Sequence, residues 1–459
     1  MKYPPYDRYY DMQTMWFGVI PFNWKTTNFR NILIGISDGT HGTHQRTITG
    51  KPLLSAKNVF NDSIKISENE SRISEEEYKL IIAKGYPKKG DLLVTCVGTL
   101  GRSIVYPYEE PLAFQRSVAF LRLEKKYDLK YFKYLIESKG YQDFLVNTAN
   151  VSAQGGIYMG DLAASEIVLP SLAEQTKIAT FLDYKTAQID QLIEKKKALI
   201  ERLNEQRIAI ITQAVTKGLN PDAPMKDSGV DWLGEVPKHW STFAIKRKFK
   251  IVNGATPKSG EERFWNGEII WITPADFSHC ERGFISKSIR KITHEGFESC
   301  GTSLVPKSSI IVTSRAPIGK VVQAGKNLCT NQGCKSLIVD TDCAAHRFYY
   351  YSLLANSEKL NSLGLGTTFM ELSNSDLGLF NLPFPPLSEQ IQIVKFLDYK
   401  TTQIDQLIEK KKTLIEKLKE YRTALITAAV TGKIDVRGFD INKNKTNATT
   451  KKRESADAG

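Results

Sequence analysis

The sequence predicts a mixed α/β fold in which two α/β domains are separated by two long helices that form an antiparallel coiled coil. The first observation is a repeat: residues 172–217 align without a gap to residues 387–432, with 32 of 46 positions identical. The second is that each copy follows a region of about 150 residues with short apolar runs typical of strands. The third is that both copies carry the same apolar stripe, so each can pair with the other. Together they predict an internal duplication with pseudo-twofold symmetry.

The repeated blocks are predicted to be helices because neither contains proline or glycine before the glycine that ends it, Gly218 or Gly432. Apolar residues recur three and four positions apart over several turns, which is the pattern of a helix that packs on another helix. Two copies of one face pack most simply around a twofold axis. Packing of each helix on its own domain alone remains an alternative. The predicted coiled-coil core is Ile189, Leu192, Ile193, Leu199, Leu203, Ile404, Leu407, Ile408, Leu414 and Leu418.

The regions before the helices differ between the copies but share short motifs. WFGVIPFNW at 16–24 matches WLGEVPKHW at 232–240. Apolar and β-branched runs predict strands, and longer periodic segments predict helices, without the regular alternation of a doubly wound sheet. Strands are expected at 91–96, 103–106, 269–272, 310–313 and 335–339, and helices at 74–84, 129–145 and 344–361.

These patterns divide the chain into six segments. The predicted boundaries are 1–170 for the first α/β domain, 171–218 for the central helix, 219–235 for a linker, 236–385 for the second α/β domain, 386–433 for the C-terminal helix and 434–459 for a disordered basic tail.

Composition indicates a protein without membrane spans that binds a polyanion. The chain has 459 residues, 41% of them hydrophobic, and no apolar run approaches the ~20 residues of a membrane helix. The N-terminus has no apolar signal core, so we expect a cytoplasmic protein. The 63 Lys and Arg exceed the 50 Asp and Glu by a formal charge of +13, which fits a nucleic acid partner.

Motifs for catalysis are missing from the sequence. Three Gly-Lys pairs that could end a phosphate-binding loop lack the Ser or Thr that must follow: Pro52, Val321 and Ile434 stand there instead. Zinc could be held by Cys329, Cys334 and Cys343 with His279 or His346, but the spacings match no standard site, and buried cysteines are the simpler interpretation. We therefore expect no catalytic residue and no metal in this chain.

The FLDYKT and QIDQLIEKKK segments of both blocks, with SGVDWLGEVPKHW between the units, resemble the specificity subunit of type I restriction–modification systems. The resemblance covers about residues 12–436. Residues 254–257 with 271–274 open the second domain as the family often does, and residues 38–41 open the first.

The resemblance implies a noncatalytic DNA-recognition subunit from a prokaryotic cytoplasm. Each α/β domain, called a target-recognition domain in the family, would read one half of a bipartite asymmetric site, and the coiled coil would set the spacer. Two modification subunits with S-adenosylmethionine would methylate adenine, and restriction subunits with ATP and magnesium would cleave DNA. They would dock on the exposed faces of the two repeats, whose shared polar residues Gln188, Asp190, Gln191 and Glu194 exceed what a coil core needs.

Two other functions remain open from the sequence. A stand-alone sequence-specific DNA-binding regulator would use the same two domains without partner subunits. A self-sufficient nuclease or methyltransferase is a third hypothesis, which the missing motifs disfavour.

DNA contacts are expected from basic and amide side chains in polar segments. The segment with His41 and His44 is expected to be a loop with donors for nucleic acid. Gln115 and Gln332 are expected at equivalent positions, where they could support the fold. The predicted DNA-binding residues are Thr43, Gln45, Arg46, Lys57, Asn58, Arg102 and Arg116 in the first domain, and Lys258, Arg263, Asn266, Arg315, Lys320 and Gln332 in the second.

Overall fold

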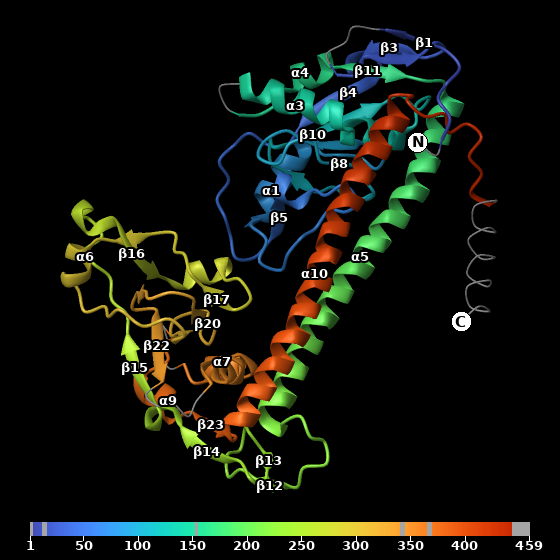
Figure 1. Ribbon diagram of the computed structural model, residues 1–459. Coiled ribbons are helices and arrows are strands. Elements are labelled where there is room, and N and C mark those ends of the chain that lie inside the picture. The colour runs from blue at the N-terminus through green and yellow to red at the C-terminus, as the bar shows by residue number, and fades with distance from the viewer. Residues whose placement is uncertain (1–2, 12–15, 152–154, 340–344, 365–369, 443–459) are drawn as a thin grey trace, which may run out of the picture. The chain divides into compact units, whose positions relative to one another are not determined.

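The computed structural model divides into two compact units, residues 1–196 with 413–459 and residues 197–412 (Figure 1). Each unit holds one α/β domain, the first part of the long helix that follows it, and the last part of the other long helix. The structure describes residues 3–11, 16–151, 155–339, 345–364 and 370–442.

The α/β domain of the first unit contains a four-stranded antiparallel sheet, ordered β4-β10-β7-β8, and a three-stranded sheet, ordered β6-β5-β9. The two central strands of the larger sheet are almost wholly apolar because both of their faces are buried. Two ribbons, β1 with β2 and β3 with β11, complete the domain. The strands are β1 (Tyr9–Asp11), β2 (Val19–Pro21), β3 (Lys25–Asn28), β4 (Leu33–Asp38), β5 (Lys51–Leu54), β6 (Arg72–Ile73), β7 (Leu92–Thr95), β8 (Ser103–Val105), β9 (Ala113–Phe114), β10 (Val118–Leu123) and β11 (Glu166–Leu169).

The second unit repeats this plan strand for strand and adds β17 at one sheet edge. Its larger sheet is ordered β15-β22-β19-β20-β17, its smaller sheet β18-β16-β21, and its ribbons are β12 with β13 and β14 with β23. The strands are β12 (Met225–Asp227), β13 (Glu235–Pro237), β14 (Ser241–Ala244), β15 (Phe249–Asn253), β16 (Trp265–Ile272), β17 (Phe284–Ile285), β18 (Lys291–Ile292), β19 (Ile310–Thr313), β20 (Val321–Ala324), β21 (Cys329–Thr330), β22 (Cys334–Val339) and β23 (Asn381–Phe384).

The helices of the two domains also correspond. Two predicted helices are each broken in two, because a polar side chain donates to a preceding carbonyl at the break: the Ser138 hydroxyl to Leu135 and the Asn356 amide to Ser352. The helices are α1 (Glu75–Lys84), α2 (Leu129–Glu137), α3 (Lys139–Val151) and α4 (Met159–Ala164) in the first unit, and α6 (His294–Glu298), α7 (His346–Ala355), α8 (Ser357–Ser362) and α9 (Asn374–Leu379) in the second.

The long helices α5 (Leu172–Lys217) and α10 (Leu387–Val430) pair antiparallel, as predicted (Figure 1). In the first unit Arg422 Nε lies 3.0 Å from an Asp190 carboxylate oxygen. In the second unit Arg207 Nε lies 3.3 Å from an Asp405 carboxylate oxygen. In the repeat, Asp190 corresponds to Asp405 and Arg207 corresponds to Arg422, each 215 residues apart. The two ion pairs are therefore equivalent, with the helices exchanged. The pairing is therefore symmetric, as the duplication requires.

The helix–helix interface follows positions that alternate four and three apart. Ile189, Ile193, Ile404 and Ile408 are buried, as predicted, and Leu203 and Leu418 are partly buried. The prediction was wrong for four leucines, which lie outside the interface with 36–43% of their surface exposed. Because a two-stranded coil buries only a narrow stripe, a leucine one position from that stripe is turned away from the partner helix. These leucines are Leu192, Leu199, Leu407 and Leu414.

The repeated tryptophan motif forms the support for the end of a long helix. Gly432, which follows α10, lies against Pro21 and Trp24, and Gly218, which follows α5, lies against Trp240. Both glycines have positive φ, as is common where a helix ends. Each motif therefore contacts the end of the long helix that follows the other domain.

A shared hydrogen-bond network fixes each domain to its own long helix. The Tyr134 hydroxyl donates to Asp183 at 2.8 Å, and the Tyr351 hydroxyl donates to Asp398 at 2.6 Å. Buried Gln175 accepts from the Asp128 amide at 3.0 Å, and its counterpart Gln390 accepts from the Ala345 amide at 2.9 Å. The polar residues repeated in the two helix blocks thus serve partly to hold the domains.

The predicted linker and the start of the predicted tail both contain regular contacts. Residues 225–227 of the predicted linker form β12, which pairs with β13. In the tail predicted to be disordered, Ile434 and Val436 are buried, and the Asp435 amide donates to the Pro4 carbonyl at 2.7 Å. Residues 443–459 of that tail lie outside the described residues. Among the residues the structure describes, no helix combines the length and apolarity needed to cross a membrane.

Candidate nucleic-acid interface

The ends of β4 and β15 mark equivalent places in the two domains. Gly39 N donates to Val118 O at 3.2 Å, and Gly254 N donates to Cys334 O at 3.4 Å. One residue later, the amides of Thr40 and Ala255 donate to Phe114 O and Thr330 O. The same backbone framework therefore supports both domains at this point.

These hydrogen bonds correct one sequence prediction. The Gln115 amide donates to Leu54 O in the first domain, and the Asn331 amide makes the matching bond to Ile272 O in the second. Gln115 therefore corresponds to Asn331, and Gln332 corresponds to Arg116. The prediction was wrong by one position because an alignment by identical letters ignores strand register.

The framework depends on glycine where the backbone of another strand comes close. A Cβ on Gly39 would lie 2.2 Å from Phe114 O, and one on Gly254 would lie 2.1 Å from Asn331 O. No carbon atom fits at that distance from a backbone oxygen. The strand end would have to move to admit any other residue.

Replacement of Gly39 by alanine is therefore expected to lower the free energy of unfolding of the first unit by about 1–3 kcal/mol, the usual cost of overpacking. Gly35→Ala on the same strand is the matched control, because nothing lies within 4 Å of its Cβ. Urea unfolding of both variants measures the difference. Equal stability of the two variants would contradict a steric requirement for glycine at 39.

In the first domain this framework borders a small cavity of about 150 Å³. Asp38 and His41 form a pair at its edge, with Nε2 of the imidazole 2.8 Å from the carboxylate. Burial raises the pKa of the Cys96 thiol to about 12, so this cysteine lines the cavity as an uncharged thiol. The lining is Asp38, His41, Cys96, Val97, Arg116, Ala119, Gly156, Ile157, Tyr158 and Met159.

In the second domain the equivalent positions carry polar side chains bonded to one another. Thr256 Oγ1 donates to Gln332 Oε1, and Arg315 Nε lies 3.2 Å from a Glu371 carboxylate oxygen. Lys335 Nζ donates to Asn253 Oδ1 at 3.1 Å. Burial lowers the pKa of Lys335, and nearby Arg315 lowers it further, although Glu371 opposes the shift.

Three of the residues predicted to bind DNA lie on the matched framework of their own domain, Arg116 in the first domain and Arg315 and Gln332 in the second. All three are exposed. Arg116 belongs to the cavity lining, and Arg315 occupies the position that Val97 has in the first domain, as the matched bridges 97–156 and 315–371 show.

The other predicted residues of the first domain are spread over its surface or buried in it. Thr43, Gln45 and Arg46 are exposed. Asn58 was predicted wrongly, because it is 3% exposed and its side chain accepts a hydrogen bond from the Ser55 amide at 2.9 Å. In the second domain Asp276 accepts the equivalent hydrogen bond from the Thr273 amide. Both side chains cap a short 3-10 turn, a role that short polar residues favour.

Two predicted cations of the first domain have partners inside it. Lys57 Nζ lies 2.8 Å from a carboxylate oxygen of Glu70, whose own side chain is buried. Arg102 lies over the Phe60 ring, 4.7 Å from its centroid, and donates to Val59 O at 3.3 Å. These contacts give both side chains structural roles.

In the second domain Lys258, Arg263, Asn266 and Lys320 are exposed. Arg263 pairs with Glu295 at 2.8 Å and lies over the Phe264 ring. Among the histidines of the polar 38–46 segment, His44 is partly buried between Thr40 and Glu77, so only His41 is exposed. The segment is a loop, as predicted, and its exposed histidine is His41.

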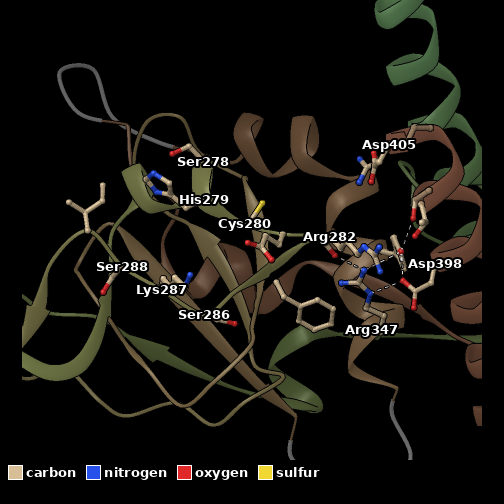
Figure 2. Close-up of a pocket in the computed structure, with 17 residues that line it drawn as sticks. Ser278, His279, Cys280, Arg282, Ser286, Lys287, Ser288, Arg347, Asp398 and Asp405 are labelled. Carbon is tan, nitrogen blue, oxygen red and sulfur yellow. Dashed lines mark hydrogen bonds and ion pairs between the residues drawn. The ribbon is translucent and has the colours of Figure 1, made fainter. Parts of the chain in front are cut away.

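A larger cavity of about 1210 Å³ lies in the second unit between residues 278–289 and helices α7 and α10 (Figure 2). Arg347 on α7 donates to Asp398 at 3.0 Å and to the Arg282 carbonyl at 2.8 Å. Arg207, also in the lining, is paired with Asp405. The Arg347–Asp398 pair joins the domain to α10, and the Arg207–Asp405 pair joins the two long helices.

Of the residues considered for a zinc site, Cys343 lies outside the described residues. Cys329 and Cys334 are buried, and burial raises the pKa of Cys329 to about 11 and that of Cys334 as well. Within the described ranges, no three His, Cys, Asp or Glu side chains are grouped as metal ligands.

Comparison with known proteins gives the family. A family model described as the type I restriction modification DNA specificity domain matches residues 45–202 and 237–419, more than half of the chain. The chain belongs to this specificity family. Each match spans most of one α/β domain of the specificity fold and part of the long helix after it, so both units are family domains.

Relatives within the specificity family extend along the whole chain. The putative type I restriction enzyme MjaX specificity subunit of Methanocaldococcus jannaschii is 27% identical over 433 residues, 92% of this chain and 96% of the relative. The MjaIX specificity subunit of the same organism is 37% identical over 181 residues, and the match covers 39% of this chain and only 41% of that relative. A chain solved in work on complex assembly and conformational transition of the type I R-M system has a TM-score of 0.67 at 16% identity, over 90% of this chain and 99% of that chain. That likeness shows a shared fold.

Proposed function

We propose that this chain is the noncatalytic DNA-recognition subunit of a type I restriction–modification complex. Each target-recognition domain reads one half of a bipartite asymmetric site, and the antiparallel helices set the spacer between the halves. The observation that carries the proposal is the contrast between near-identical helices and domains whose exposed side chains differ on one framework. A twofold arrangement presents two reading surfaces, and divergence lets each surface read a different sequence.

The partners and cofactors follow from this role. Two modification subunits that hold S-adenosylmethionine methylate adenine in the two half-sites. Restriction subunits that use ATP and magnesium cut the DNA. The net charge of +13 supports contact with the phosphates of the duplex.

The first part of each long helix offers a matching surface for a modification subunit. Leu192 and Leu407 occupy equivalent positions and are 38% and 43% exposed, and Leu172 and Leu387 form a second exposed pair. The neighbouring Gln188 and Gln191 are exposed and identical to Gln403 and Gln406. Identical exposed surfaces are what two copies of one partner require.

Leu192→Glu is accordingly expected to weaken one of two binding sites for the modification subunit at least tenfold, because a charge would be buried in an apolar contact. Leu407→Glu is its matched control and should weaken the other site equally. Sedimentation of the reconstituted complex measures the ratio of subunits. The account predicts one modification subunit on each single variant and none on the double variant; two on every variant would contradict it.

Binding of purified chain to DNA tests the proposal as a whole. The chain together with its modification subunits is expected to bind and methylate a specific bipartite site, whereas the chain alone binds DNA weakly. Tight specific binding by the chain alone, unchanged by modification subunits, would instead identify a stand-alone regulator. Methylation or cleavage by the isolated chain would identify a self-sufficient enzyme.

A further inference from the structure

The lining positions of the first-domain cavity and the equivalent positions of the second domain share one backbone arrangement and carry different side chains. The Ile157 amide donates to Cys96 O at 2.8 Å, and the Leu372 amide donates to Ser314 O at 2.9 Å. With the bonds of Gly39 and Gly254, these contacts define which positions correspond. The pairs are Asp38 and Asn253, His41 and Thr256, Cys96 and Ser314, Val97 and Arg315, Arg116 and Gln332, Ala119 and Lys335, Gly156 and Glu371, Ile157 and Leu372, Tyr158 and Ser373, and Met159 and Asn374.

None of these ten pairs keeps the same residue, although the residues that shape the backbone around them are kept. Gly101 and Gly319 occupy the same turn in the two domains, and their amides donate to Thr95 O and Thr313 O, which are also equivalent. Gly39 and Gly254 hold the adjoining strand end. A lining that differs at every matched position, on a backbone framework that both domains keep, fits a different ligand in each domain.

The chemistry of the lining also differs in kind. In the first domain the exposed groups are the Arg116 guanidinium, the Asp38–His41 pair and two apolar side chains, Val97 and Tyr158, which are 37% and 52% exposed. In the second domain the amide of Gln332 and the Arg315–Glu371 pair take their places, while Lys335 is buried and bonded to Asn253. Each set combines donors and acceptors that can bond to polar groups of a ligand.

The size and charge of the site select the ligand. A cavity of about 150 Å³ is smaller than the ~300–1,000 Å³ of sites that enclose small molecules or cofactors. It can accept the edge of a larger molecule. On a chain of charge +13, the edges of base pairs in a duplex fit a shallow site with paired donors and acceptors.

We propose that these ten matched positions are the base-reading site of each domain, with Arg116 and Gln332 as equivalent specificity-determining side chains. The inference rests on the proposed function and deepens it. Arginine donates two hydrogen bonds to O6 and N7 of guanine, and glutamine bonds to N6 and N7 of adenine. The first domain reads guanine through Arg116, and the second reads adenine through Gln332.

A reciprocal exchange tests the assignment in the complex of the full chain with its modification subunits. Arg116→Gln is expected to lower methylation of sites with the native base at one position of the first half-site by about 10- to 100-fold relative to sites with another base there, since one bidentate contact discriminates by ~1–3 kcal/mol. Gln332→Arg is expected to change one position of the second half-site only. A DNA library randomised in both half-sites gives the preference at every position.

Arg102→Gln is the matched control, because this arginine contacts Phe60 and Val59 within the domain. It is expected to leave base preference unchanged at every position. Thermal unfolding of each variant confirms folding, and exposed Arg116 and Gln332 should tolerate exchange.

The outcomes separate the two proposals. If the unmodified complex recognises no bipartite site, the proposed function fails and the inference fails with it. If the unmodified complex recognises such a site but both exchanges leave every base preference intact, the function stands and the base-reading assignment is overturned. A change of preference confined to one half-site for each variant supports the assignment.

Discussion

A chain in which residues 25–169 are replaced by a copy of residues 241–384 is expected to recognise an inverted repeat of the second half-site. The junctions fall in matching ribbons, because β3 pairs with β11 as β14 pairs with β23. Both domains of this variant read the same sequence, and the twofold relation of the helices presents them to opposite strands. Methylation of a randomised DNA library in the presence of modification subunits measures the recognised site.

The reciprocal variant, with residues 25–169 in both places, is the matched control and is expected to recognise an inverted repeat of the first half-site. The spacer should be the same in both variants and in the parent, because the helices are unchanged. An asymmetric site for either variant would show that the domains do not read half-sites independently.

Insertion of seven residues into each long helix, after Lys196 in α5 and after Lys411 in α10, is expected to lengthen the spacer and leave both half-sites unchanged. The two insertion points are equivalent and lie between the ion pairs Asp190–Arg422 and Arg207–Asp405. Seven residues add about 10.5 Å of helix, which corresponds to roughly three base pairs of rise, and keep the helix–helix interface in phase to within about 20°. Sequencing of methylated sites gives the spacer.

Insertion into α5 alone is the control for this experiment. It moves Arg207 out of register with Asp405, so the pair of helices loses its symmetric contact and a defined spacer is not expected. An unchanged spacer after the double insertion would show that something other than the helices sets the distance between half-sites.

The long helices and their antiparallel pairing were predictable because the duplication itself carries the information. An unbroken apolar pattern ending at Gly218 and Gly432 defines both helices. Two helices with the same apolar face favour packing about a twofold axis. The four misplaced leucines show the limit of this reasoning. A stripe of leucine and isoleucine does not reveal which residues contact a partner helix and which stay exposed.

The partly buried arginines of the helix pair carried a signal that could have set the register. Arg207 and Arg422 lie on the interface stripe, where a charged residue needs a partner. Burial alone would lower the pKa of Arg422, but Glu137 and Asp190 outweigh it and raise that pKa. Matching of arginine with aspartate across the repeat would have fixed the register from the sequence.

The candidate base-reading site was only partly predictable. Arg116, Arg315 and Gln332 were among the sequence candidates because basic and amide residues are common DNA ligands, and their role in reading bases stays a prediction. Asn58 was misjudged because a buried cap and an exposed reader use the same residue type. The correspondence of Arg116 with Gln332 could be established only from strand register. Register is defined by backbone hydrogen bonds, whereas a sequence alignment matches identical residues.

Sequencing of methylated adenines in DNA from cells that express this chain with its modification subunits tests the central claim most directly. The account predicts one motif made of two unlike specific halves, separated by unspecified bases, with a methylated adenine in each half. A single continuous motif, or methylation that does not depend on this chain, would contradict it.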